Sequence, residues 1–448
     1  MAKLTRLKIE AFRNVEPVEL RFGGGFNVLL GLNATGKTTL LEVIAAILSD
    51  DFSALREEAF AFEYDLEIDG AELTASFRSK PKLLYGGADR DGSTVLRTET
   101  TEYEPDWFAD VEVRIGQSEV KYIAHIDASG LTVQVNDSPV QKTERPITLS
   151  RGVLAYTLAP IIDLEFQRLN GQRLHPLLFR FASNHLLCRF DESLEFFRLI
   201  VHGSEYSARR PVKSPIVKFI RDRVRPATGF MSRIVTSSRQ SIIPDEVTER
   251  VLRMEQVASG EVAESLSLRA DHLDFLQQVT TILGFKTGEL QIRLLEKKVD
   301  ATSESWSFGD FRFMFERTDG SIVSHDRLSY GQKRLLAFFY YLAANRAYVI
   351  ADELVDGLHH RWIQECIDAI GDRQAFLASQ NPLLFDYLEF DSPEDVRSSF
   401  ILCRLDTREG TERMLWSNMT EYDADRFFEA YKVGIQHVSE ILVDKGLW

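Results

Sequence analysis

The chain has 448 residues, 44% of them hydrophobic and 27% charged, which is typical of an ordinary globular protein of two or three domains. A net charge of −15 argues against a surface that binds polyanions over its whole extent, because nucleic-acid binding depends on clustered cations. The three cysteines lack any C-x-x-C spacing, and no apolar stretch reaches the ~18 residues of a membrane helix. We therefore expect a cytoplasmic protein without a disulfide framework, a zinc ribbon or a membrane segment.

The first 50 residues predict a strand, a glycine-rich loop and a helix in succession. Phe26–Leu30 is a short apolar run typical of a strand that is buried on both faces, and residues 38–48 are apolar at helical spacing. The residues between them, from Gly31 to Thr38, fit the pattern G-x-x-x-x-G-K-[ST]. A strand before this motif and a helix after it is the context in which it binds nucleotide phosphates.

The residue types of this loop suit a phosphate-binding role. Glycines let successive backbone N–H groups turn inward around phosphate oxygens, and the following helix adds its positive N-terminal end. Lys37 is expected to reach the β- and γ-phosphates, and Thr38 to offer its hydroxyl to Mg²⁺. We therefore expect ATP and Mg²⁺ as cofactors, bound by Gly31, Asn33, Ala34, Thr35, Gly36, Lys37, Thr38 and Thr39.

Residues 60–135 alternate between apolar and polar side chains, with a hairpin signal at Asp69-Gly70. This pattern predicts an antiparallel β subdomain beside the nucleotide site, within a first ATPase lobe over residues 1–165. An acidic run from Glu99 to Glu112 lies inside it. The run is interpreted as a solvated edge, with a docking face for a basic partner as the alternative.

Residues 166–305 predict a mostly helical insertion, with Leu186, Phe190, Leu194 and Phe197 at helical spacing. Within it, residues 201–240 carry many cationic and few acidic side chains. This basic segment is a candidate contact for nucleic acid or a protein partner, although pairing with the acidic run would account for it equally well. The candidate contact residues are Arg209, Arg210, Arg221, Arg223 and Arg225.

A second ATPase lobe is predicted over residues 306–448. It begins with strand-like sequence from Trp306 to Phe315. Tyr348–Glu353 then predicts a buried strand that ends in two carboxylates. Asp352 is expected to hold Mg²⁺ through water, and Glu353 to polarise the attacking water as a general base.

Leu328-Ser329-Tyr330-Gly331-Gln332 precedes an apolar helix over residues 335–342. With the phosphate loop before it and the acid pair after it, the chain resembles the ABC ATPases of the RecF, SMC and OLD group, whose signature reads L-S-x-G-[QE]. The resemblance implies that Ser329, Gly331 and Gln332 contact the γ-phosphate held by a second copy. The active sites would then be composite, within a homodimer or a higher homo-oligomer.

The resemblance extends to three further positions. Ala11-Phe12-Arg13-Asn14 is similar to a segment that places an arginine near the nucleotide, which implies that role for Arg13. Asp356 stands where the family has a D-loop that crosses the dimer interface. Gln380 replaces the family's switch histidine, and because an amide cannot become a cation we expect slow or partner-regulated hydrolysis. Position alone suggests Gln167 or Gln172 as the Q-loop residue.

The fold class expected from these patterns is α/β, an ABC-type P-loop ATPase head with a mixed sheet, an antiparallel β subdomain and a mostly helical insertion. The chain resembles the ATPase subunits of the PARIS and Septu antiviral defence systems, which implies a sensor or scaffold that works with a separate, nuclease-like effector. Only about 60 residues follow Pro382, too few for a nuclease domain of ordinary size.

Two other functions stay open at this point. A RecF-like DNA-repair ATPase would clamp duplex DNA in its ATP-bound form and would use the basic segment. A transporter-type ABC subunit is less favoured, because the β-rich segment and the long insertion do not fit its small helical subdomain.

Overall fold

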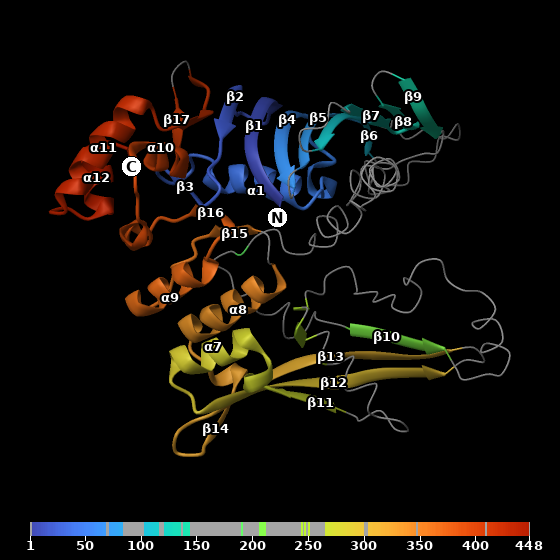
Figure 1. The fold of residues 1–448 in the computed structure, drawn as a ribbon, viewed down its shortest axis with the longest axis vertical. Helices are drawn as coiled ribbons and strands as arrows, with labels where there is room; N and C mark the ends of the chain where they lie inside the picture. Colours follow the sequence, from blue (N-terminus) through green and yellow to red (C-terminus); the bar gives the residue numbers. More distant parts are fainter. Residues whose placement is uncertain are drawn as a thin grey trace, which may run out of the picture. The chain divides into compact units, whose positions relative to one another are not determined.

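The computed structural model describes residues 2–68, 71–83, 103–115, 121–135, 138–143, 190, 206–211, 243–244, 246–247, 250, 265–299, 303–345, 348–407 and 410–447. The chain divides into two compact units that alternate along the sequence (Figure 1). The first unit comprises Met1–Arg189, Ala347–Asp352 and Asp372–Trp448, and the second comprises Phe190–Arg346 and Glu353–Gly371.

The described residues of the first unit form an eight-stranded antiparallel sheet. Its buried side chains alternate along each strand, as Phe60, Phe62 and Tyr64 do, because successive residues of a strand point to opposite faces. In sheet order the strands are β2 (Val18–Arg21), β1 (Ala2–Phe12), β4 (Phe60–Ile68), β5 (Ala71–Leu83), β6 (Tyr103–Ile115), β7 (Lys121–Asp127), β8 (Gly130–Val135) and β9 (Ser138–Thr143).

A second sheet of the first unit is mostly parallel. Its strands, in sheet order, are β15 (Tyr348–Asp352), β16 (Gln374–Ala378), β3 (Phe26–Leu30), β17 (Phe400–Asp406) and β18 (Arg413–Asn418). The first four run parallel and only β18 is antiparallel to its neighbour. Strands β16 and β3 are almost entirely buried, which explains their continuous apolar sequences. The carboxyl ends of the four parallel strands therefore lie at one edge of this sheet.

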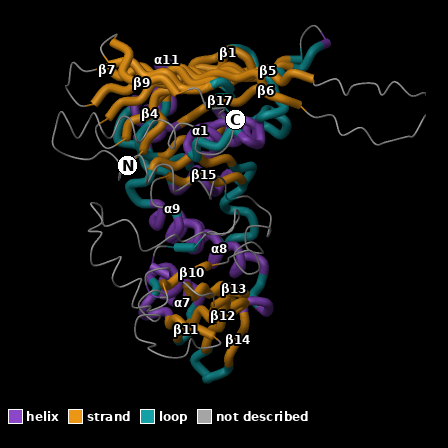
Figure 2. The backbone as a smooth tube through the Cα atoms, turned by 90° about the vertical axis from the view of Figure 1, so that its right-hand side faces the viewer, coloured by secondary structure: helices purple, strands orange, loops and turns teal. Residues whose placement is uncertain are grey.

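Helix α1 (Lys37–Leu48) shares one apolar core with both sheets of the first unit. The antiparallel sheet lies on one side of α1 in Figure 2 and β15 on the other. Stacked rings of Phe52, Phe60, Phe77 and Trp107 fill much of this core. The other helices that the structure describes in this unit are η1 (Ser53–Leu55), η5 (Pro382–Tyr387), α10 (Pro393–Ser399), α11 (Glu421–Val433) and α12 (Val438–Asp444).

The second unit contains an antiparallel sheet and the helices that cover it. In sheet order its strands are β10 (Tyr206–Pro211), β13 (Ser303–Glu316), β12 (Thr287–Val299) and β11 (Ser265–Arg269), and β14 (Ile322–Ser324) also pairs with β13. Phe275, Phe313 and Tyr340 meet edge to face where the helices pack on the sheet. The helices among its described residues are η3 (Ala270–His272), α7 (Asp274–Leu283), η4 (His325–Arg327), α8 (Tyr330–Ala344) and α9 (His360–Ile370).

The local elements expected around the motifs are confirmed. The strand at Phe26–Leu30, the helix after the phosphate loop, the antiparallel sheet and the strand that ends at Asp352 are all present. The α/β fold class with a mixed sheet and an antiparallel β subdomain is therefore correct. No helix among the described residues is long and apolar enough to cross a bilayer.

The mostly helical structure expected for residues 166–305 is not seen in the described part of this segment. Strands β10, β11 and β12 flank α7 there, so the described residues are not mostly helical. In β12 the buried residues Leu290 and Ile292 show the alternation that is typical of a strand. The adjacent Leu294 and Leu295 interrupt this alternation, so the sequence does not reveal the strand clearly. Of Leu186, Phe190, Leu194 and Phe197 only Phe190 is described.

The three consecutive domains expected from the sequence remain a prediction, because most of residues 166–305 lie outside the described residues. Where it is described, the chain is grouped differently. Residues 306–346 cluster with the segment before them, and residues 372–448 cluster with the N-terminal part of the chain.

Candidate nucleotide-binding site

The phosphate loop joins the end of β3 to the start of α1 in a tight turn that its sequence permits. Gly36 has φ 86°, and Ala34 also takes a left-handed conformation, with φ 63°. A Cβ at Gly36 would lie 2.4 Å from the Met414 sulfur, and one at Gly31 would lie 2.2 Å from the Cys403 carbonyl oxygen. Gly31 is therefore required by its packing against a backbone carbonyl, and Gly36 chiefly by its left-handed conformation.

The backbone of the loop offers a set of unused hydrogen-bond donors. The first amide of α1 that meets a helical acceptor is Leu40 N, which donates to Gly36 O at 2.9 Å. Among the described residues, the amides of residues 33–39 have no acceptor. Unused amides at a helix N-terminus favour an anion, so this loop suits the phosphates of a nucleotide.

The Lys37 side chain lies over the loop that it follows. Its ammonium donates to Gly31 O at 2.7 Å and to Leu32 O at 3.0 Å. The residue is only 8% exposed, so its cation stays at the loop instead of extending into solvent. The positive charge of Lys37 thus lies at the same loop as the unused amides.

Thr38 and Asp352 come together as the sequence predicts for a shared Mg²⁺ site. The Thr38 hydroxyl donates to Asp352 Oδ2 at 2.7 Å, between the first turn of α1 and the end of β15. A hydroxyl and a carboxylate supply the hard oxygen ligands that Mg²⁺ prefers, and Mg²⁺ usually takes few protein ligands beside phosphates and water. The residues present therefore fit the ion.

The predicted switch residue Gln380 also belongs to this edge. It is the second residue after β16 and is exposed, whereas the preceding Ser379 is fully buried. Because β16 lies between β15 and β3 and runs parallel to both, its carboxyl end shares the edge with Asp352 and the phosphate loop. Ligands of α/β sheets bind at such carboxyl edges.

The β17–β18 pair supports the loop from the C-terminal part of the chain. The Trp416 indole donates to Thr35 O at 3.1 Å, and Met414 and Cys403 contact Gly36 and Gly31. Burial raises the pKa of the Cys403 thiol to about 12, so this cysteine acts as a packing residue. Sequence reasoning missed these residues, because nothing near them in sequence marks a nucleotide site.

Arg13 is held by carboxylates of its own unit. Its guanidinium makes two 2.6 Å hydrogen bonds to Glu58 and a 3.1 Å bond to Glu42, and it covers the Phe12 ring. The hydrogen bonds to Glu58 raise the pKa of Arg13 above its usual value. The structure fixes Arg13 near α1, and its expected place beside the nucleotide stays a prediction.

The signature residues begin helix α8 in the second unit. Ser329 is the N-cap of α8: its hydroxyl accepts from Gln332 N at 3.4 Å, and Gln332 Oε1 accepts from Ser329 N at 2.9 Å. This reciprocal pair is a capping box. In the single chain Ser329 is exposed, whereas Gly331 is buried.

The D-loop residue Asp356 contacts the signature helix. The Tyr330 hydroxyl donates to Asp356 Oδ2 at 2.9 Å, and partial burial together with this carboxylate raises the pKa of Tyr330. A Cβ at Gly331 would lie 2.4 Å from Gly357 O. The signature and the D-loop are therefore packed backbone against backbone.

Arg334 is a second important residue that sequence reasoning missed. It is 1% exposed, and its guanidinium donates to the carbonyls of Glu353 at 2.6 Å and Leu354 at 3.2 Å. The Phe190 ring lies 5.1 Å from it. Glu353 itself has φ 53°, a conformation that costs a residue with a Cβ of order 1–3 kcal/mol. Arg334 thus fixes the backbone of the expected general base from the signature helix.

Two of the predicted partner contacts lie on a described strand. Arg209 and Arg210 lie on β10, opposite Ser305 and Glu304 of β13. Arg221, Arg223, Arg225, Gln167 and Gln172 lie outside the described residues, as does the first part of the acidic run.

Two family models match the chain. Residues 6–118 match the model described as "AAA domain", and residues 177–386 match the model described as "AAA domain, putative AbiEii toxin, Type IV TA system". The first contains the phosphate loop and the second contains the signature and the acid pair. Both models describe AAA domains, and each matches less than half of the chain.

Curated relatives of the ATPase are DNA replication and repair proteins named RecF. The protein from Vibrio cholerae is 31% identical over 108 residues, which are 21% of this chain and 27% of that protein. The protein from Pasteurella multocida is 56% identical over 41 residues, which are 9% of this chain and 12% of that protein. The similarity therefore covers only a small part of either sequence.

Solved structures match most of the chain, at low TM-scores. The SMC head domain from Thermotoga maritima has a TM-score of 0.35 at 10% identity, over 93% of this chain and 99% of that one. A structure titled as the recombination mediator protein RecF in the RecFOR pathway has a TM-score of 0.32 at 12% identity, over 92% of this chain and 98% of that one. Scores this low add nothing to the assignment.

Replacing Arg334 tests whether it stabilises the acid-pair backbone. Arg334→Met leaves the buried Glu353 and Leu354 carbonyls without their donor, and we expect the free energy of unfolding in urea to fall by about 1–3 kcal/mol. Its neighbour Lys333 is the matched control, and Lys333→Met should change stability by less than about 0.5 kcal/mol. Equal stability of the two variants would contradict the role assigned to Arg334.

Proposed function

We propose that this chain is an ATP-binding and ATP-hydrolysing enzyme of the ABC type. The observation that carries the proposal is the phosphate loop, where the unused amides of residues 33–39, Lys37 and the Thr38–Asp352 pair all meet at one edge of the parallel sheet. The β- and γ-phosphates of ATP would accept hydrogen bonds from these amides. They would also replace the Gly31 and Leu32 carbonyls as the hydrogen-bond partners of the Lys37 ammonium. Thr38 and Asp352 would hold Mg²⁺, which neutralises charge on the phosphates.

Hydrolysis would use the acid that follows Asp352. Glu353 would accept a proton from a water molecule whose oxygen attacks the γ-phosphorus, and the bond to the β–γ bridging oxygen would break to give ADP and phosphate. Gln380 would hydrogen-bond the γ-phosphate through its amide. Because this side chain cannot become a cation, we propose slow or partner-regulated turnover.

The active site would be completed by a second copy of the chain. Ser329 and Asp356 are both exposed in the single chain. Ser329 lies at a helix N-terminus, which favours an anion, and Asp356 lies in a loop that suits an interface. In a homodimer or a higher homo-oligomer, Ser329 and Gly331 of one copy would contact the γ-phosphate on the other copy. Isologous pairing of this kind makes two equivalent sites.

We further propose that the ATPase acts in the cytoplasm as a sensor or scaffold in antiphage defence. The toxin description of the family model over residues 177–386 supports this role over a housekeeping one. A separate, nuclease-like effector protein would carry out the toxic reaction, because the residues assigned in this chain supply phosphate-binding and hydrolytic groups for ATP.

A mixing experiment tests the composite site. Lys37→Ala removes the phosphate cation, and Ser329→Arg blocks the signature, so each variant alone should lose at least 90% of its ATP hydrolysis. Mixed after dissociation, they should regain about a quarter of the wild-type rate, because half the dimers are mixed and each mixed dimer has one intact site.

Activity of the mixture is measured as released phosphate, and a mixture of Lys37→Ala with Asp352→Asn serves as the control. Both of these changes affect the phosphate-loop side, so every site in that mixture is damaged. Full activity of Ser329→Arg alone would show that each copy hydrolyses ATP independently.

A second function, a RecF-like clamp on duplex DNA, is favoured by one observation, the sequence similarity to RecF proteins. The basic segment over residues 201–240 would supply its DNA contacts. In this case ATP would close two copies around the duplex, and the wider acidic surface would stay away from it.

DNA binding separates the two functions. If the chain is a clamp, its affinity for a duplex in the presence of ATP should fall steeply with salt. A combined change of Arg221, Arg223 and Arg225 to Glu should then weaken binding at least 100-fold in a filter-binding assay. Wild-type affinity that this triple change leaves intact would rule out the clamp as described.

A further inference from the structure

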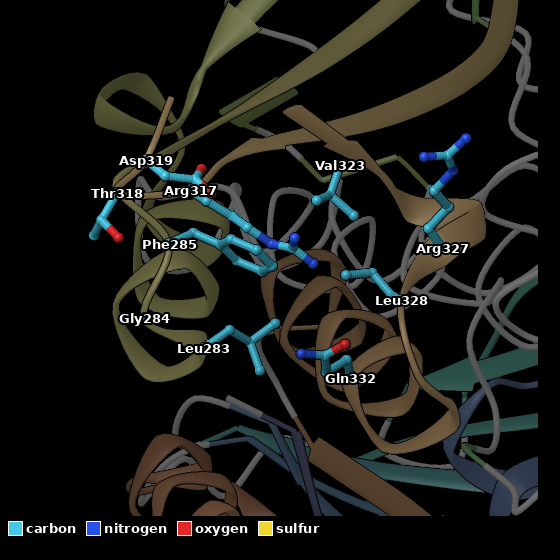
Figure 3. Close-up of a pocket in the computed structure, with 10 residues that line it drawn as sticks. All are labelled: Leu283, Gly284, Phe285, Arg317, Thr318, Asp319, Val323, Arg327, Leu328 and Gln332. Atoms are coloured by element: carbon cyan, nitrogen blue, oxygen red, sulfur yellow. The ribbon is translucent and has the colours of Figure 1, made fainter. Parts of the chain in front are cut away.

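A small pocket lies beside the signature motif, within the second unit (Figure 3). Its volume is about 270 Å³. The C-terminal end of α7, the segment between β13 and β14, and the start of α8 surround it. Its lining residues are Leu283, Gly284, Phe285, Arg317, Thr318, Asp319, Val323, Arg327, Leu328 and Gln332.

The pocket combines a few apolar side chains with one central cation, and most of its exposed lining is polar. Figure 3 shows the Arg317 side chain reaching between Phe285, Val323 and Leu328. The described residues include no hydrogen-bond or ion-pair partner for its guanidinium. The preceding acid, Glu316, pairs with Lys286 at 2.6 Å. Asp319 also lines the pocket and accepts from the Ser321 amide at 2.8 Å, and its hydrogen bonds with Ser321 and, to a lesser extent, the Arg317 charge lower its pKa. Arg327 also lines the pocket, but Figure 3 shows its guanidinium pointing away from Arg317, so Arg317 is the cation that would pair with an anion there.

The pocket is directly connected to the signature serine. Gln332 lines it, and the same side chain accepts the Ser329 amide through Oε1 at 2.9 Å. Leu328, which precedes that serine, forms part of the wall. A ligand that hydrogen-bonds the Gln332 amide or displaces Leu328 therefore acts on the N-cap of α8.

We propose that this pocket receives an acidic side chain, flanked by an apolar residue, from a partner protein, and that its occupancy regulates the ATPase through Gln332 and Ser329. The regulatory part rests on the ATPase proposed above. The carboxylate pairs with Arg317 and the apolar neighbour packs on Phe285 and Val323. The pocket is smaller than the roughly 300–1,000 Å³ of typical small-molecule sites, which suits one or two anchoring side chains of a longer segment.

The geometry also explains how occupancy changes the rate of hydrolysis. The capping box holds Ser329 in its present place, and the Gln332 Oε1 bond is half of that box. A carboxylate that orders the Gln332 amide strengthens the box and fixes the serine hydroxyl. Because a signature serine acts on the γ-phosphate, ordering it raises the rate of turnover.

Fluorescence anisotropy of a labelled peptide tests the binding step. The acidic probe is fluorescein-Gly-Ser-Leu-Glu-Phe-Asp-Ser, and the matched neutral probe has Gln and Asn in place of Glu and Asp. We expect the full-length protein to bind the acidic probe at least tenfold more tightly than the neutral one. Arg317→Gln should abolish that preference. Arg269→Gln, a change at an exposed arginine on β11 outside the pocket, should keep it within twofold.

The same proteins separate failure of the pocket from failure of the ATPase. A saturating acidic probe should raise phosphate release by the wild type and by Arg269→Gln at least twofold, and should leave Arg317→Gln unchanged. Probe binding that depends on Arg317 in a protein without measurable hydrolysis would refute the ATPase and the regulation but not the binding site. Equal binding by Arg317→Gln and wild type, or equal binding of the two probes, would overturn the pocket assignment. Displacement of the acidic probe by millimolar inorganic phosphate alone would show a simple anion site, and would also overturn it.

Discussion

The candidate site depends on how closely the β17–β18 pair packs against the phosphate loop. The carbonyl of Cys403 and the sulfur of Met414 occupy the space that a Cβ at Gly31 or Gly36 would need, and the Trp416 indole holds the Thr35 carbonyl. Held in this way, the loop keeps its amides turned away from helical acceptors. The resulting cluster of unused donors has the character of a phosphate-binding loop.

The second unit is organised around a different constraint, the attachment of the signature helix to the segment after β15. Arg334, Tyr330 and Gly331 all come from the first turns of α8, and they contact Glu353, Asp356 and Gly357. The division between the two units falls between Asp352 and Glu353. The expected metal ligand, Asp352, thus belongs to the first unit. The next residue in the chain, the expected general base Glu353, belongs to the second. A change at the signature helix would reach Glu353 through Arg334 without passing through the phosphate loop.

The sequence predicted those parts of the site whose chemistry depends on residues close together in the chain. The phosphate loop, the cap at Ser329 and the strand ending at Asp352 each follow from local spacing and helix or strand period. The residues that support the site could not be predicted from local spacing. Trp416 and Thr35 are 381 positions apart in the sequence, and nothing in the sequence distinguishes Arg334 from any other cation of a helix. The strands of the second unit were missed where Leu294-Leu295 obscures the alternation of β12.

The central claim is that ATP joins two copies of this chain at shared sites, and the mass of the Glu353→Gln protein in solution tests it most directly. This substitution removes the proposed general base while keeping the side-chain volume, so ATP should bind but persist. Light scattering should then give a monomer mass without nucleotide and a stable dimer or larger assembly with Mg-ATP, whereas the wild type should return to its starting mass as ATP is consumed. A mass for Glu353→Gln that is the same with and without Mg-ATP would contradict the account.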